Sequence, residues 1–167
     1  MRRNQNGFTL SETLTTVLLI GIIFSAIAGG TVAVKDAYEQ ITVKSEAQTL
    51  LSTAVTDLSA DLHSVTQILT TDSGTYYYCT TRSTAVYYSN DSDLGILVNN
   101  SDASQSVALV TEKTSSSGLI TRIKDESITY ANGVFTLEVE VVKQKSPDKV
   151  VESTELVIRP YADQLGS

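Results

Sequence analysis

The sequence predicts an α+β fold in which one long N-terminal helix packs its second half on an antiparallel β-sheet. Three observations predict it: an uncharged apolar run over residues 13–34, an apolar stripe at helical spacing over 47–69, and short β-prone segments separated by turn residues after Thr70. The 167 residues are enough for one globular domain with a real core plus an appendage.

The first element is an apolar helix of membrane-spanning length. From Thr13 to Val34 the chain carries no charge. At about 1.5 Å of rise per residue this run makes roughly 33 Å of helix, enough to cross a hydrocarbon core of about 30 Å. Two arginines precede the run, whereas the lysine and two acids that follow it sum to −1. We therefore expect a cytoplasmic N-terminus and export of everything after Lys35.

A cleaved secretory signal and a plain uncleaved anchor are the alternatives for this run. The small residues SAIAGG at 25–30 resemble a signal cleavage site. The apolar run nevertheless continues to Val34, beyond an ordinary signal core of about 7–15 residues. An ordinary signal also leaves unexplained why an acid, Glu12, stands at the head of the run.

The second element is an amphipathic helix over 35–70. Its apolar positions recur in steps of four or three and are separated mainly by Ser, Thr and Asp: Ala47, Leu51, Val55, Leu58, Leu62, Val65 and Leu69. The lone His63 falls on or beside the polar face. With no second His or a Cys near it, we expect a solvated side chain and not a metal ligand.

Eight later segments are predicted strands of a sheet over 71–160: TYYYCT (75–80), TAVYYS (84–89), LGILV (94–98), SVALVTE (106–112), LITRI (119–123), SITYA (127–131), VFTLEVEVV (134–142) and VVESTELVI (150–158). The tyrosines at 76–78 and 87–88 are then β-formers on two paired strands, and an exposed aromatic patch for adhesion is the alternative.

The surest pairing joins SITYA to VFTLEV through Asn132-Gly133, the dipeptide that a two-residue type I′ hairpin turn prefers. On the second of these strands an apolar set, Phe135, Leu137, Val139 and Val141, alternates with a polar set, Thr136, Glu138 and Glu140. The apolar face needs a cover, and the amphipathic helix needs a platform, so we expect the two to pack together.

Composition argues against several functions. With 19 acidic against 12 basic residues the formal charge is −7, and no basic patch is present, so we expect no nucleic-acid partner. Cys79 is alone, which rules out an intramolecular disulfide and predicts a small buried hydrophobe. One histidine and no Gly-rich phosphate loop leave no catalytic set, so we expect neither an enzyme nor a cofactor.

NDSDLG, residues 90–95, is the remaining candidate metal site. Its alternate Asn90, Asp91 and Asp93 before a glycine form a fragment of a calcium loop. A bidentate Glu at the right distance is missing, so the segment predicts a polar turn and no metal.

The N-terminal segment RRNQNGFTLSETL resembles the class III signal of type IV prepilins and related pseudopilins. A short basic leader ends in Gly7 and is followed by Phe8, Thr9 and Leu10. Glu12 is the fifth residue after the glycine, directly before the apolar run. The resemblance covers about residues 1–34, and the helix-then-sheet order of 35–167 agrees with a pilin fold.

The resemblance implies that a membrane prepilin peptidase cleaves the leader, 1–7, after Gly7 and that the new amine of Phe8 is methylated. The mature chain keeps 10 basic and 19 acidic residues, a net of −9. Residues 8–34 would anchor the subunit in the cytoplasmic membrane and then join a filament core, with 35–167 as the exported head. The implied partners are other pilin subunits, the peptidase and the assembly platform, and the implied assembly residues are Thr9, Leu10 and Glu12.

Two departures from the common pilin pattern bear on function. Gly29, followed by Gly30, stands where many relatives have a helix-interrupting proline, and these glycines either loosen the helix or let neighbouring helices pack closely. One cysteine cannot close the C-terminal disulfide of many major pilins. We therefore expect a structural subunit of a type IV pilus-like filament, a minor pilin. The alternatives are a pseudopilin of a type II secretion or DNA-uptake system and a single-span membrane-anchored binding module.

Overall fold

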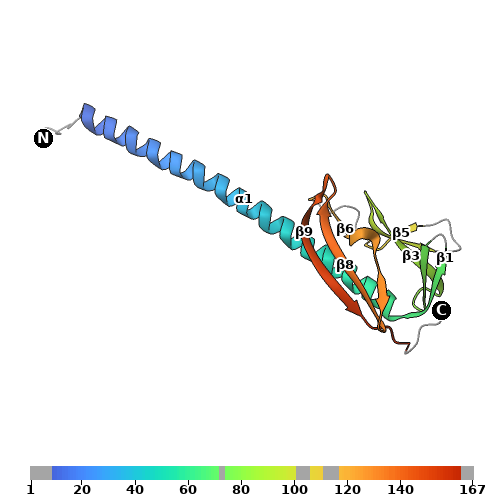
Figure 1. Cartoon of the computed structure of the whole chain (residues 1–167). Helices are drawn as coiled ribbons and strands as arrows, with labels where there is room; N and C mark the ends of the chain where they lie inside the picture. Colours follow the sequence, from blue (N-terminus) through green and yellow to red (C-terminus); the bar gives the residue numbers. More distant parts are fainter. Residues whose placement is uncertain (1–8, 72–73, 101–105, 111–116, 163–167) are drawn as a thin grey trace. The chain divides into compact units, whose positions relative to one another are not determined.

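The computed structural model describes residues 9–71, 74–100, 106–110 and 117–162 (Figure 1). The chain divides into two compact units, 1–42 and 43–167. One helix, α1 (Leu10–His63), makes up most of the first unit and begins the second, and every strand belongs to the second. A long helix followed by antiparallel sheets confirms the predicted α+β class.

In the first unit α1 carries no charge on any side from Thr13 to Val34. Leucine and alanine favour the helix, and threonines donate hydroxyl hydrogen bonds to carbonyls of the preceding turn, as Thr15 does to the Ser11 carbonyl at 2.6 Å. The helical backbone continues through Gly29 and Gly30. By length and composition α1 can cross a membrane.

In the second unit α1 buries one face in a hydrophobic core. Its buried apolar residues are spaced by three or four, as predicted: Ala47, Leu50, Leu51, Ala54, Leu58 and Leu62. Leu58 and Leu62 are fully enclosed, and Val55 is partly buried against the same core.

The predicted end of this helix at residue 70 is wrong. α1 ends at His63, and strand β1 (Val65–Thr71) follows immediately. Val65 and Leu69 continue the apolar spacing of the helix, but VTQILTT is rich in β-branched residues, and pairing with the next strand decides its conformation.

The first sheet is a five-stranded antiparallel meander in the order β1-β2-β3-β4-β5. Its later strands are β2 (Gly74–Cys79), β3 (Thr84–Asp91), β4 (Gly95–Asn100) and β5 (Ser106–Ala108). β2 pairs with β3, so the tyrosines at 76–78 and 87–88 lie on neighbouring strands as predicted. β5 stops at residue 108, earlier than the predicted 112, and residues 111 and 112 lie outside the described part of the chain.

The second sheet is built around β8 (Val134–Lys143). β6 (Leu119–Ile123), β7 (Thr129–Ala131) and β9 (Ser146–Ile158) all pair antiparallel with it. In the β7–β8 turn, Ala131 pairs with Val134, and both central residues have positive φ, 54° at Asn132 and 77° at Gly133. Positive φ at both positions is the signature of the predicted type I′ turn.

The core is enclosed by the face of α1 in the second unit together with both sheets. The inward face of β8 is the predicted apolar set, Phe135, Leu137, Val139 and Val141, each at most 3% exposed. From the first sheet Val86, Ile96 and Val98 join the same cluster. Cys79 is fully buried among them, as predicted.

Candidate functional site

The N-terminus of α1 is fixed by a reciprocal contact between Thr9 and Glu12. The Thr9 backbone N–H and hydroxyl both donate to Oε2 of Glu12, at 2.9 and 3.0 Å. In return the Glu12 backbone N–H lies 3.4 Å from the Thr9 hydroxyl oxygen. Thr-x-x-Glu with these bonds is a capping box, which satisfies otherwise unpaired N–H groups of the first turn.

The capping box holds the carboxylate of Glu12 in one place on the exposed first turn. Both donors from Thr9 reach Oε2, and no residue that the structure describes donates to Oε1. Leu10, beside it, is 88% exposed. The cleavage-site residues Gly7 and Phe8 lie outside the described residues, so their predicted processing and methylation remain predictions.

The helix that follows carries large apolar side chains on its surface. Exposure is 69% at Leu14, 70% at Val17 and 67% at Phe24, and every residue from Thr9 to Ile41 is exposed. A helix that is hydrophobic all round must be covered by lipid or by other helices. The arrangement is therefore suited to insertion and helix–helix assembly.

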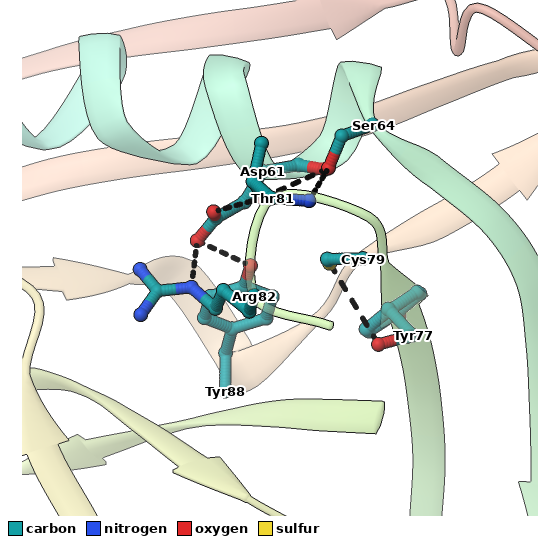
Figure 2. Close-up of polar contacts among 7 residues, drawn as sticks. All are labelled: Asp61, Ser64, Tyr77, Cys79, Thr81, Arg82 and Tyr88. Carbon is teal, nitrogen blue, oxygen red and sulfur yellow. Dashed lines mark hydrogen bonds and ion pairs between the residues drawn. The ribbon is translucent and has the colours of Figure 1, made fainter. Parts of the chain in front are cut away.

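A second polar site lies where α1 ends in the second unit, and we call Asp61, Ser64, Thr81, Arg82 and Tyr88 the Asp61 cluster (Figure 2). Asp61 is only 4% exposed. Its Oδ2 accepts from Arg82 Nε at 2.7 Å and from the Tyr88 hydroxyl at 3.1 Å, and its Oδ1 accepts from the Thr81 hydroxyl at 3.1 Å. Ser64 donates its hydroxyl to the Asp61 carbonyl at 2.8 Å.

In and beside this cluster, burial and the charge of Asp61 keep the ionisable hydroxyl and thiol groups protonated, which suits a structural role. Burial, and secondarily the charge of Asp61, raises the pKa of Tyr88 well above its ordinary value. The same two causes raise the pKa of the Cys79 thiol to about 11. A buried thiol with a raised pKa is a poor nucleophile, so these groups are not suited to covalent catalysis. The hydrogen bonds of the Asp61 cluster instead hold the end of α1 to the β2–β3 loop and to β3.

Sequence reasoning missed this cluster because it placed Asp61 among the polar residues of the helix. A signal was present. Asp61 follows Ala54 and Leu58 at steps of four and three, so it lies on the buried side of α1. No comparable signal identifies Arg82, which lies in the β2–β3 loop and reaches Asp61 only after the chain folds.

The expectation that His63 is solvated is wrong. Its ring is half-buried, Nδ1 lies 2.6 Å from the Arg159 carbonyl oxygen, and the ring stacks on Tyr161 with centroids 5.1 Å apart. The Tyr161 N–H also donates to the His63 carbonyl at 2.8 Å, which satisfies a free carbonyl at the end of α1. Helical periodicity does not foresee a C-terminal segment that returns to the end of the helix.

The NDSDLG segment is a polar turn, as predicted. Asp91 Oδ1 accepts the backbone N–H groups of Asp93 and Leu94, both at 2.8 Å, and these bonds lower the pKa of Asp91. Within the described ranges, no group of three or more His, Cys, Asp or Glu side chains is placed to hold a metal ion.

The tyrosines divide between core and surface. Tyr77 is buried and its pKa is raised to about 12 by desolvation, whereas Tyr78 and Tyr87 are 40% and 37% exposed. Tyr76 and Tyr87 meet edge to face across β2 and β3 with centroids 5.2 Å apart. The sheet therefore uses its tyrosines as strand residues and also presents some of them to solvent.

Comparison with known proteins finds a family match at the N-terminus. Residues 2–28 match the family profile of the prokaryotic N-terminal methylation motif. No curated protein and no solved structure matches the chain. The match begins in the basic leader and includes Thr9, Glu12 and most of the apolar run. Residues 2–28 therefore carry the class III prepilin signal of type IV pilins and pseudopilins, and this similarity covers the N-terminal segment of the chain.

Proposed function

We propose that this chain is a minor pilin, a structural subunit of a type IV pilus-like filament that assembles through α1. The observation that carries the proposal is the methylation motif at 2–28, which continues into a helix exposed at every described position up to Ile41. The motif suggests processing by a prepilin peptidase and association with other pilin subunits. In the membrane stage the N-terminus faces the cytoplasm and the head is exported.

Glu12 is the residue on which assembly depends. In the membrane it lies just before the uncharged run, at the interface, where a carboxylate stays hydrated. In a filament core built from neighbouring helices water is excluded, and an unpaired carboxylate is costly. Cleavage after Gly7 frees an amine at Phe8, and the Phe8 amine of an adjacent subunit pairs with Glu12. Only an axial offset between neighbouring subunits that brings the amine of one to the Glu12 carboxylate of the other avoids an unpaired charge.

The capping box supports this role because it orients the acceptor in advance. Thr9 uses Oε2 of Glu12, and this leaves Oε1 for the incoming amine. Glu12 thus has two functions, the start of the helix and the pairing with a neighbour, and a substitution must separate them.

The test compares variants of Glu12 in a strain that lacks the wild-type copy. Glu12→Gln keeps a side chain that can close a capping box but removes the charge, whereas Glu12→Ala removes both. Glu12→Asp keeps the charge with a shorter reach. We expect all three to insert and to be cleaved, with Glu12→Gln and Glu12→Ala almost absent from sheared filaments and Glu12→Asp intermediate.

Two results would contradict this role. Normal incorporation of Glu12→Gln would show that the carboxylate acts only as a helix cap. Loss of all variants from the membrane pool would show a folding or insertion defect. The wild-type amount in the same filaments tests the minor-pilin assignment: trace amounts are expected, abundance would indicate a main fibre subunit, and absence would indicate a pseudopilus or an anchored module.

A further inference from the structure

The second unit contains a cavity that is separate from the N-terminal motif and shares only Tyr88 with the Asp61 cluster. Its volume is about 530 Å³, within the range of about 300–1,000 Å³ that is typical of small-ligand sites. Six of its lining residues matter here, namely Tyr77, Tyr87, Tyr88, Asp125, Glu126 and Ser127. We call it the tyrosine cavity.

One wall of the tyrosine cavity is a short loop fastened to β3. Asn90 on β3 donates its side-chain amide to the Ile123 carbonyl at 2.7 Å and accepts the Ile123 N–H at 2.9 Å. The Asn90 backbone N–H donates to Glu126 Oε1 at 3.1 Å, and the Tyr77 hydroxyl contacts the Ile128 carbonyl at 3.4 Å. These bonds, made from both ends of the loop, hold Asp125 and Glu126 beside the tyrosines.

The negative charge of the loop is only partly offset, because Lys124 interacts with the charge of Asp125 but forms its ion pair with Glu138. Asp125 and Glu126 are exposed, and no ion pair joins either of them to another residue that the structure describes. The nearest lysine in sequence, Lys124, has its Nζ 2.7 Å from Glu138 Oε2. Two carboxylates thus remain at an opening lined by aromatic rings and hydroxyl groups.

Aromatic rings and carboxylates together favour one class of ligand. The face of a tyrosine ring attracts cations within about 6 Å, and a carboxylate adds a charge-assisted contact. An anion would meet two like charges, and a neutral solute would gain neither attraction. Two carboxylates without a third ligating side chain also do not form a metal site among the described residues.

We propose that the tyrosine cavity binds an organic cation, an ammonium group carried either by a small solute or by a lysine side chain. The ammonium group lies against the tyrosine rings, and Asp125 and Glu126 neutralise it. Every residue that lines the cavity belongs to the second unit, so binding can be measured on the chain without filament assembly.

The test uses the full chain, labelled with ¹⁵N, in micelles of an uncharged detergent. Choline and N-acetyl-lysine-methylamide represent the two sources of the cation, and 3,3-dimethylbutan-1-ol is the neutral isostere of choline. We expect saturable amide shifts confined to residues 87–89 and 125–128 with at least one of the two cations, and none with the neutral isostere. The cation that binds more tightly identifies the source. Equal shifts with the neutral isostere, or no saturable shifts with either cation, would overturn the proposal.

Variants test whether cation binding requires the carboxylate of Asp125. Asp125 has a φ of 53°, a conformation that asparagine tolerates well, so Asp125→Asn removes the charge without disturbing the loop. We expect it to weaken cation binding about fivefold, the scale of one exposed charge contact. The matched control is Asp148→Asn, an equal charge change at an exposed residue that does not line the cavity. Unchanged binding in Asp125→Asn, or equal weakening in Asp148→Asn, would contradict a specific site.

Discussion

At the scale of single residues, the Asp61 cluster shows how a buried charge is tolerated. The Asp61 carboxylate is 4% exposed and accepts from Arg82, Thr81 and Tyr88. Removing a carboxylate from water costs several kcal/mol, and only donors of good geometry offset that cost. The three donors come from the β2–β3 loop and from β3, so the same bonds hold that part of the first sheet against the end of α1.

Arg82→Ala should therefore destabilise the protein. It leaves Asp61 without its charged partner, but the Arg82 side chain is itself 32% exposed, so water replaces part of the lost interaction. We expect the free energy of unfolding to fall by about 2 kcal/mol, measured by denaturant titration with near-ultraviolet circular dichroism of the tyrosines. Lys124→Ala is the control. It breaks the more exposed pair with Glu138, which water screens, and should lower the free energy of unfolding much less. Equal losses in the two variants would show that burial of Asp61 is not the cause.

Cys79 gives the protein a dependence on alkaline pH. Burial raises its pKa from 9.0 to about 11 in the folded state. Below pH 9 both folded and unfolded chains keep the thiol proton, so stability is unaffected. Between about pH 9 and pH 11 the unfolded chain loses the proton first, and the free energy of unfolding falls as pH rises.

Denaturant titrations of wild type and Cys79→Ala at pH 8, 9, 10 and 11 test this dependence. Tyr77, with a pKa raised to about 12, contributes a similar decline from about pH 10 upward in both proteins. Wild type should therefore lose more stability than Cys79→Ala between about pH 9 and pH 11. Parallel declines would show that the thiol is not protected by burial.

At the scale of elements, two glycines share a backbone conformation but differ in their surroundings. Gly95 and Gly133 both have φ of 77°. A Cβ on Gly133 would meet nothing within 4 Å, whereas one on Gly95 would lie 2.8 Å from the Thr121 carbonyl oxygen. Gly133→Ala thus measures the cost of the left-handed conformation alone, about 1–2 kcal/mol. Gly95→Ala adds a clash with backbone and should cost about 1–3 kcal/mol more. Thermal or denaturant unfolding of the two variants compares them directly, and equal losses would contradict the close approach of β4 to β6.

Local sequence patterns predicted most elements of this fold, and tertiary contacts explain the exceptions. The Asn132-Gly133 turn and the alternation on β8 depend on adjacent residues, so they are visible in the sequence. The end of α1 depends on pairing of Leu69 with Tyr76, which lies across a turn and overrides the helical spacing. Glu140 lies on the predicted polar face of β8 yet is only 5% exposed. Arg122 on β6 covers it and forms an ion pair, with 2.8 Å between Arg122 Nη2 and Glu140 Oε2.

The candidate sites also divide into one that local sequence predicts and two that only tertiary contacts form. The prepilin signal is a contiguous motif and was found from the sequence. The Asp61 cluster and the tyrosine cavity each join residues more than twenty positions apart, and no spacing rule brings such residues together.

At the scale of the whole molecule, the two units face different requirements. Among the described residues the buried core begins at Ala47, with Val43 packed against it, whereas the large apolar side chains from Leu10 to Val34 are exposed on the helix. The apolar side chains of the first unit therefore need a cover of lipid or of other helices, whereas the second unit has its own core.

Residues 35–167 should consequently fold without the apolar run. We expect this fragment to be soluble and monomeric, with mixed helix and sheet by circular dichroism and one cooperative thermal transition. Because its one cysteine is buried and forms no disulfide, dithiothreitol should leave the melting temperature unchanged. Aggregation of the fragment, or a melting temperature that falls with reductant, would contradict a self-contained head.

Whether the N-terminal motif is processed is the most direct test of the central claim. The predicted cleavage point after Gly7 lies within the motif at 2–28, just before the capping box of Thr9 and Glu12 at the start of α1. The measurement is the intact mass of the protein extracted from the membrane of its native host. We predict the loss of residues 1–7 and the gain of one methyl group on Phe8. An uncleaved chain, or cleavage within SAIAGG at 25–30, would contradict the account of this protein as a pilin-like subunit.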